Sequence, residues 1–126
     1  MPEAPFLPPL KGDRLTLILD LDETLIHFNE EEDFFAVRPG CNEFLSKMKD
    51  HFEVVVFTAS VQEYADWVID QIVTEKVIEH RLYWHHCIIE EEEEGGRLYI
   101  KDLGMLGREL SKSIIVDNLI ESFLNN

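Results

Sequence analysis

Three short runs of apolar residues constrain the fold of this chain more than any other feature. They are residues 15–19 (LTLIL), 53–57 (EVVVF) and 113–117 (SIIVD). Each run is nearly continuous in apolar residues rather than alternating, which is typical of strands covered on both faces of a parallel sheet. The sequence therefore predicts a buried parallel sheet built from these strands.

The segment between the first two runs has the pattern of a helix. Residues 41–52 (CNEFLSKMKDHF) place Phe44, Leu45 and Met48 on one helical face, and the RPG of residues 38–40 marks the helix start. A strand, a helix and a second strand in this order predict a βαβ unit.

A second helix is expected directly after residues 53–57. Ser60 and Glu63 form an S-x-x-E capping box, which predicts a helix start at this point. The apolar residues that follow recur at helical spacing and predict a face packed on the sheet. These residues are Val61, Tyr64, Ala65, Val68, Ile69 and Ile72.

A β-hairpin is expected in the second half of the chain. Gly95 and Gly96 lie between two apolar segments, 87–89 and 98–100, and a glycine pair favours a tight turn. Together these elements predict an α/β protein with a doubly wound, mostly parallel, Rossmann-like sheet and a small β-hairpin insertion.

Length and composition predict a single domain. A chain of 126 residues with 45% hydrophobic content buries one modest core. Four prolines among the first nine residues predict a flexible lead-in over residues 1–13, followed by the domain over 14–126. With no apolar run near the length of about 20 residues that a membrane span needs, we expect none. The two cysteines predict no disulfide framework.

The charge of the chain is strongly negative. There are 26 acidic and 11 basic side chains, for a formal net charge of −15, which disfavours binding to nucleic acid or to anionic membranes. The acidic clusters at residues 30–33 and 90–94 are expected to be solvated loops or hairpin tips. A phosphorylated partner is also repelled at long range, so phosphate chemistry requires a local metal ion, a lysine or oriented backbone amides.

Polar side chains follow each of the predicted strands. Asp20 follows the first, Thr58 the second, and Asp117 with Asn118 ends the third. Because ligands bind beyond the carboxyl ends of parallel strands, we expect these groups to meet in one crevice. Lys101, after the hairpin, is placed to reach the same crevice.

These residue types suit phosphoryl transfer assisted by magnesium, which prefers oxygen ligands. Asp20, a backbone carbonyl near Asp22, and Asp117 or Asn118 could form part of the ion's shell. Asp20 could attack phosphorus to give an aspartyl-phosphate, while Asp22 protonates the leaving oxygen and later deprotonates water. Thr58 and Lys101 would hold the phosphate oxygens.

Several segments also resemble the FCP/SCP-type phosphatases, a branch of the haloacid dehalogenase superfamily that dephosphorylates the C-terminal domain of RNA polymerase II. The segments are LILDLDETLIH, RPG, FTAS, YADWVID, YIKDL, LGREL and IIVDN, and the resemblance runs over residues 15–123. It implies a phosphoserine or phosphothreonine protein or peptide as substrate. It favours the nucleus or cytosol as compartment, with the mitochondrion as the alternative.

The resemblance assigns the same residues to the same chemistry. It implies Asp20 as nucleophile and Asp22 as general acid and base, with Thr58 and Lys101 on the phosphate. To these we add Thr24, the threonine of the D-x-D-x-T pattern, as a phosphate ligand. For magnesium the implied ligands are Asp20, the Asp22 backbone carbonyl, Asp117 and Asn118.

The chain departs from the family pattern at three places. Trp84 stands in RLYWHHC where the family usually has arginine, and an indole cannot replace a guanidinium on phosphate, which affects the expected substrate affinity or peptide preference. Residues 27–40 form a short connection where many members carry a larger insertion. The chain stops at Asn126, whereas family domains continue with another strand and a helix. We therefore expect a domain truncated at its C-terminus, with apolar surface exposed beside residues 113–117 and low stability in isolation.

Other interpretations were weighed against phosphatase chemistry. A protein-binding module of the same fold, resembling a subunit of the mitochondrial inner-membrane translocase, or an inactive fragment is the main alternative. A calcium loop starting at Asp20 is disfavoured because Leu25 stands where the loop needs glycine. Packing is expected for the remaining candidates, namely a zinc cluster of His80, His85, His86 and Cys87, the aromatic residues Phe57 and Trp67, and Cys41.

Overall fold

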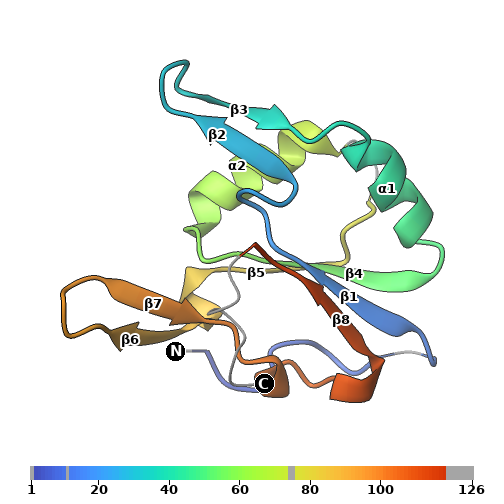
Figure 1. Cartoon of the computed structure of the whole chain (residues 1–126). Coiled ribbons are helices and arrows are strands. Elements are labelled where there is room, and N and C mark those ends of the chain that lie inside the picture. Colours follow the sequence, from blue (N-terminus) through green and yellow to red (C-terminus); the bar gives the residue numbers. More distant parts are fainter. Residues whose placement is uncertain (1, 11, 74–75, 119–126) are drawn as a thin grey trace.

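A four-stranded parallel sheet forms the centre of the protein (Figure 1). The computed structural model describes residues 2–10, 12–73 and 76–118. The strand order is β5-β4-β1-β8, so the first run of the sequence lies between the other two. The sequence patterns predicted three of these strands, and β5 is an addition. The strands are β1 (Leu15–Leu19), β4 (Phe52–Phe57), β5 (His80–Leu82) and β8 (Ser113–Val116).

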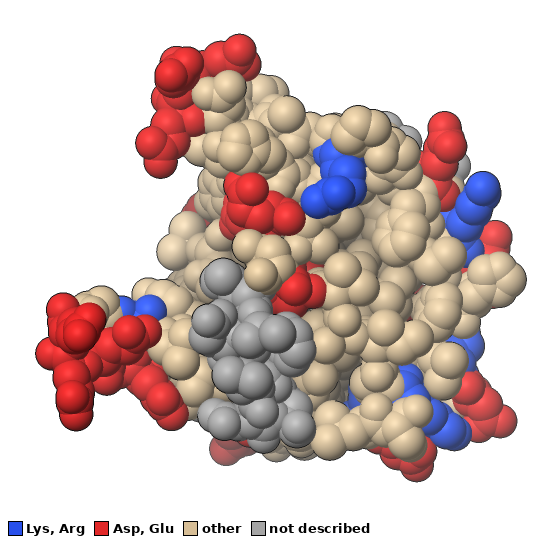
Figure 2. Space-filling model, viewed as in Figure 1, with Lys and Arg blue, Asp and Glu red and all other residues tan. Residues whose placement is uncertain are grey.

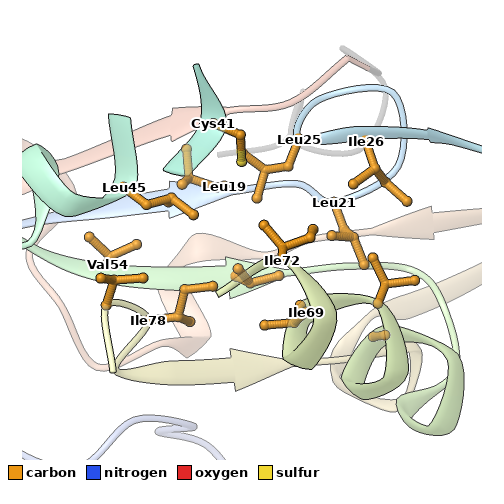
Figure 3. Packing of buried hydrophobic residues seen from close by; sticks show 14 of the residues in the cluster. Leu19, Leu21, Leu25, Ile26, Cys41, Leu45, Val54, Ile69, Ile72 and Ile78 are labelled. Atoms are coloured by element: carbon orange, nitrogen blue, oxygen red, sulfur yellow. The ribbon is translucent and has the colours of Figure 1, made fainter. Parts of the chain in front are cut away.

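Both helices, α1 (Cys41–Met48) and α2 (Gln62–Ile72), cover the same face of this sheet (Figure 1). Between them and the strands lies the larger apolar cluster, shown in close-up in Figure 3. Each fully buried aliphatic side chain of such a cluster contributes about 1.5–3 kcal/mol to stability. The residues labelled there are Leu19, Leu21, Leu25, Ile26, Cys41, Leu45, Val54, Ile69, Ile72 and Ile78.

Irregular segments and short 3₁₀ helices cover the opposite face, where Ile18, Val55 and Phe57 belong to a second buried cluster. Part of this cover comes from the proline-rich lead-in. The backbone N–H groups of Phe6 and Leu7 donate to the carbonyls of Met105 and Leu106 at 3.0 and 3.1 Å, and Leu7 is buried. The lead-in, expected to be flexible, therefore includes a segment that packs on the sheet.

Two hairpins project to the left in Figure 1. One pairs β2 (Ile26–Asn29) with β3 (Phe34–Val37), and the other pairs β6 (Ile88–Glu91) with β7 (Arg97–Ile100). The second was predicted, and Gly95 and Gly96 form its turn with φ of 86° and 95°, a region that favours glycine. Figure 2 shows acidic side chains gathered over both tips, so the acidic clusters are solvated hairpin tips as expected.

Several packing predictions were wrong. Phe44 of α1 is 39% exposed although Leu45 beside it is buried. Trp67 of α2 is 45% exposed rather than a core residue, and its ring packs edge-on against Phe34 and Phe35 of β3.

Strand β8 pairs with β1 as expected, but Ile114 and Val116 are each 44% exposed. Ile114 and Val116 are two residues apart and therefore lie on the same face of β8. Their exposure contradicts the predicted burial on both faces, but it agrees with the apolar surface expected beside residues 113–117.

The start of α2 also differs from the prediction. Val61 is the N-cap of the helix and makes no side-chain capping bond, so the capping box of Ser60 and Glu63 does not form. The Ser60 hydroxyl donates instead to the carboxylate of Asp22. The distant Asp22 carboxylate therefore replaced the local backbone N–H as the partner of Ser60, which a pattern within one helix could not reveal.

Neither helix among the described residues has the length and apolar character to cross a bilayer.

Candidate functional site

Lys101 lies between two carboxylates at the carboxyl ends of adjacent strands. Its Nζ is 3.0 Å from Oδ1 of Asp20, which follows β1, and 2.5 Å from Oδ2 of Asp117, which follows β8. The Lys101 and Asp117 side chains are 2% and 1% exposed, and Asp20 is also buried. The structure thus brings together three residues that the sequence predicted to share a crevice. The convergence follows from parallel pairing, which puts the ends of β1 and β8 side by side.

This buried cluster contains two carboxylates and one ammonium, so its charges do not balance. Desolvation raises the pKa of Asp20 to about 6, the Lys101 ammonium partly opposes the rise, and the neighbouring Asp117 adds to it. The backbone N–H of Leu21 also donates to Asp20 Oδ1 at 2.8 Å and favours the ionised form. At neutral pH Asp20 is therefore mainly ionised, but in an environment that an additional cation would improve.

Asp22 lies in a different environment from Asp20, although only one residue separates them. Its Oδ2 accepts a hydrogen bond from the Ser60 hydroxyl at 2.6 Å, and its Oδ1 accepts one from the Tyr64 hydroxyl at 2.9 Å. Burial and the nearby Asp22 carboxylate raise the pKa of Tyr64, so the phenol stays a hydrogen-bond donor. Ser60 and Tyr64 were not predicted as site residues from the sequence. Their signal was a pair of hydroxyls close after Thr58, which we interpreted as helix-start and core positions.

Thr58 follows β4 and is 1% exposed. Its N–H donates to the Leu82 carbonyl of β5, and its Oγ1 accepts from the N–H of Ser60 at 3.0 Å. A hydroxyl that accepts a hydrogen bond retains its own proton for another acceptor. Thr58 is therefore suited to donate to a bound anion at this edge of the sheet.

A cavity of about 490 Å³ lies beside Asp117, and Thr24 and Asn118 are among its lining residues. Its other lining residues are largely apolar, including Val116 at the end of β8. The Thr24 carbonyl accepts a hydrogen bond from Arg38 Nε at 2.6 Å. Thr24 and Asn118 thus lie on the Asp117 side of the site, whereas Thr58 does not line this cavity.

The donor set at the sheet edge fits magnesium by its chemistry. Asp20 and Asp117 supply carboxylate oxygens, and Asn118 and the Asp22 backbone supply neutral carbonyls, all of which are hard ligands. The buried negative charge of Asp20 and Asp117, which raises the pKa of Asp20, favours the binding of a divalent cation at this edge.

A second acidic cluster lies at the opposite, amino ends of the strands. Among the residues that the structure describes, Glu53, Glu79 and His80 are the only group of three or more His, Cys, Asp or Glu side chains whose ligand atoms all lie within 4.8 Å of one another. However, both oxygens of Glu53 accept from Arg108 at 2.7 Å, and Glu79 forms a comparable double contact with Arg14 at 2.5 and 3.1 Å. Arginine therefore occupies the positions that a metal would need, and we interpret this cluster as structural.

The zinc cluster that we disfavoured, His80, His85, His86 and Cys87, does not form a group of this kind in the part of the chain that the structure describes. His85 and His86 lie in a 3₁₀ helix, Trp84–His86, and their ring centroids are 4.4 Å apart. His86 packs edge-on against Phe6. Burial raises the pKa of the Cys87 thiol to about 11 and also raises that of Cys41, so packing describes both cysteines.

Trp84, the departure from the family pattern, lies beside the start of α2. Its indole is 39% exposed, and its backbone N–H donates to the Ser60 carbonyl at 3.1 Å. The 3₁₀ helix that carries Trp84 is therefore tied to the residue that also contacts Asp22 and Thr58. A side chain substituted at position 84 would therefore extend from backbone that lies close to the candidate site.

Comparison with known proteins assigns the chain to a family. The family model of NLI interacting factor-like phosphatases matches residues 15–126. The chain therefore belongs to this family, which is the FCP/SCP-type branch of the haloacid dehalogenase superfamily. The sequence resemblance is thereby confirmed.

Two curated relatives are each 42% identical to the chain. One is an uncharacterised protein of Schizosaccharomyces pombe, matched over 94% of this chain and 41% of the relative. The other is phosphatase PSR1 of Saccharomyces cerevisiae, matched over 94% of this chain and 31% of the relative. The chain thus spans less than half the length of these relatives.

A solved structure confirms the fold. The fission yeast RNA polymerase II CTD phosphatase Fcp1, bound to beryllium fluoride, superimposes with a TM-score of 0.68 at 22% identity. The match covers 87% of this chain and 38% of that chain. The predicted α/β, haloacid dehalogenase-like architecture is therefore correct.

Proposed function

We propose that this domain is a magnesium-dependent phosphatase of phosphoserine or phosphothreonine in proteins or peptides. The observation that carries the proposal is the buried Lys101 ammonium between Asp20 and Asp117, in a chain that belongs to a phosphatase family. Further relatives named as CTD small phosphatase-like proteins support a phosphoprotein substrate. The intact pair of aspartates favours catalysis over a binding module.

Asp20 and Asp22 take the chemical steps in this proposal. The Asp20 carboxylate attacks phosphorus in line, and the bond from phosphorus to the serine or threonine oxygen breaks as Asp22 donates its proton to that oxygen. Asp22, now ionised, then takes a proton from the water that attacks the aspartyl-phosphate. Inorganic phosphate leaves, and Asp20 returns to its carboxylate form.

The remaining residues hold the transferred group. Lys101 and the Thr58 hydroxyl would donate to the phosphoryl oxygens, with Thr24 assisting from the turn after β1. Magnesium, held by Asp20, the Asp22 carbonyl, Asp117 and Asn118, would supply positive charge to the phosphoryl oxygens when bound. This local positive charge would attract the phosphate group of a substrate although the net charge of the protein is −15.

Hydrolysis of an aryl phosphate by the purified protein, with and without magnesium, tests the proposal. We expect activity that requires magnesium and is lost in Asp20→Asn. Asp50→Asn, at an exposed acid after α1, is the control and should retain full activity. Activity that persists in Asp20→Asn would contradict the mechanism, and a folded but inactive wild type that binds phosphopeptides would favour the binding module.

A further inference from the structure

The two oxygens of the Asp22 carboxylate each have a separate hydroxyl donor. Ser60 donates to Oδ2 at 2.6 Å, and Tyr64 donates to Oδ1 at 2.9 Å. Each carboxylate oxygen has about two lone-pair positions, so each hydroxyl takes one position on its oxygen and leaves room for a second partner. The pair of contacts therefore defines the orientation of the carboxylate plane and not merely its position.

The Tyr64 hydroxyl is itself held in place. The Tyr64 ring packs edge-on against Phe28 of β2 with centroids 6.1 Å apart, and it lies 6.4 Å from the Trp67 ring. Tyr64 is also in the first turn of α2, so its backbone belongs to a regular element. A phenol supported by two aromatic neighbours and a helix loses little further entropy when it contacts Asp22.

Ser60 is held by its own backbone. Its N–H donates to Thr58 Oγ1 at 3.0 Å, and its carbonyl accepts from the N–H of Trp84 at 3.1 Å. Ser60 therefore connects the end of β4 to the 3₁₀ helix of Trp84, and its hydroxyl connects both to Asp22. The same residue orients a candidate phosphate ligand and the candidate general acid.

We propose that Ser60 and Tyr64 are positioning residues that orient the Asp22 carboxyl for proton transfer to the leaving oxygen. The inference rests on the proposed function, because it concerns the acid step of that reaction. With one lone-pair position of each oxygen taken by a hydroxyl, the proton of Asp22 occupies the open position, which is the one that a leaving group meets. Loss of either hydroxyl lets the carboxyl rotate and lowers the fraction of aligned encounters.

Substrates with different leaving groups test this role. A serine alkoxide needs protonation as it leaves, whereas an aryl oxide with electron-withdrawing substituents leaves without it. We expect Tyr64→Phe and Ser60→Ala to lower kcat/KM for a phosphoserine peptide by about ten- to a hundredfold, and for the activated aryl phosphate by less than about threefold. The ratio kcat/KM is used because it reports the steps up to loss of the leaving group.

Matched variants separate positioning from damage to the fold. Tyr64→Phe keeps the ring contacts, and Ser60→Thr keeps a hydroxyl and should recover most of the activity lost in Ser60→Ala. Gln62→Ala, at an exposed site in the same turn of α2, is the control and should behave as wild type. In an Asp22→Asn background, Tyr64→Phe should cause no further loss on the peptide, because the group that it positions is gone.

Equal losses on the two substrates, or a full loss from Tyr64→Phe in the Asp22→Asn background, would overturn the positioning role while leaving the proposed function intact. Absence of hydrolysis by the wild type, in the same assay, would overturn the proposed function and this inference with it. The larger loss on the peptide, with recovery in Ser60→Thr, would support both.

Discussion

At the amino ends of the central strands, the buried Glu53 carboxylate meets the guanidinium of Arg108, whereas at the carboxyl ends two buried carboxylates share Lys101. Burial alone would raise the pKa of Glu53, but hydrogen bonds from Arg108 and Thr16 outweigh it and hold this pKa below its ordinary value. Burial raises the pKa of Asp20 to about 6, since the Lys101 ammonium opposes the rise only in part and the neighbouring Asp117 charge adds to it.

The two ends of one sheet therefore use buried charge in opposite ways. The Glu53 carboxylate is matched in charge by a bidentate arginine and also accepts from the Thr16 hydroxyl, so it stabilises the fold and is poorly suited to bind a ligand. A carboxylate in excess opposes folding until a cation or a proton joins it. The comparison predicts that substitutions at the amino end change stability, while those at the carboxyl end change activity.

The largest expected effect is the loss of activity in Asp20→Asn. Removing the nucleophile should lower kcat by about three orders of magnitude or more. The midpoint of thermal unfolding without divalent cations should not fall, because the substitution removes surplus negative charge. A phosphatase assay and a thermal melt of the same samples check this, and a marked loss of stability would contradict the comparison.

Glu53→Gln should have the converse effect. It leaves Arg108 buried without its anionic partner, and breaking a buried pair in this way costs about 3–5 kcal/mol in the free energy of unfolding. Urea denaturation measures the loss, with Glu109→Gln at an exposed position as the control. Activity per folded molecule should stay near that of wild type. A loss below about 1 kcal/mol would show that this network is not structural.

The pH dependence of stability should differ between the two ends in the metal-free protein. Asp20 has a folded pKa of about 6, above its ordinary 3.8, so its favourable contribution is present at low pH and is lost as pH rises through that interval. Asp20→Asn should therefore gain about 2–3 kcal/mol over wild type between pH 4 and 7.

Glu53 has the opposite sign. Its folded pKa lies below the ordinary 4.5, so its stabilising contribution is present above that pH and is lost as pH falls. The deficit of Glu53→Gln should shrink on acidification. Urea denaturation at several pH values in the presence of a chelator measures both trends. Parallel pH profiles for wild type and both variants would contradict the comparison.

Magnesium should stabilise the folded protein only through the site at the carboxyl ends of the strands. If it binds the folded state, a concentration of 100 times Kd adds about 2.7 kcal/mol and raises the unfolding midpoint. The increase should disappear in Asp117→Asn and persist in Arg108→Gln, even though the second variant starts from a lower midpoint. Thermal melts with and without magnesium measure it, and an equal increase in all proteins would indicate non-specific binding.

The smallest expected effect concerns Trp84. Trp84→Arg introduces the guanidinium that the family usually has near the start of α2, and it should lower KM for a phosphopeptide about three- to tenfold with little change in kcat. The matched control is Trp84→Gln, which is polar but carries no charge. An equal change in KM for both variants would show that removal of the indole, and not the arginine, is responsible.

The sequence was sufficient for features whose cause is local. Continuous apolar runs predicted β1 and β4, and a glycine pair predicted the turn between β6 and β7. Strand β5 was missed because it has three residues, too few for a periodic pattern. The burial of β8 was overestimated, since an edge strand and a central strand can share the same composition.

For the candidate site, the sequence by itself predicted that Asp20 and Asp117 would meet, because parallel strands bring their carboxyl ends to one edge. For Lys101, which follows the hairpin strand β7, the sequence indicated only that it could reach this edge, and the tertiary structure decided its contacts. Only the tertiary structure decided how Asp22 is held. Its donors, Ser60 and Tyr64, are 38 and 42 positions away along the chain. A hydroxyl at a helix start has local and distant acceptors, and which one it uses depends on how the helix packs against the turn after β1.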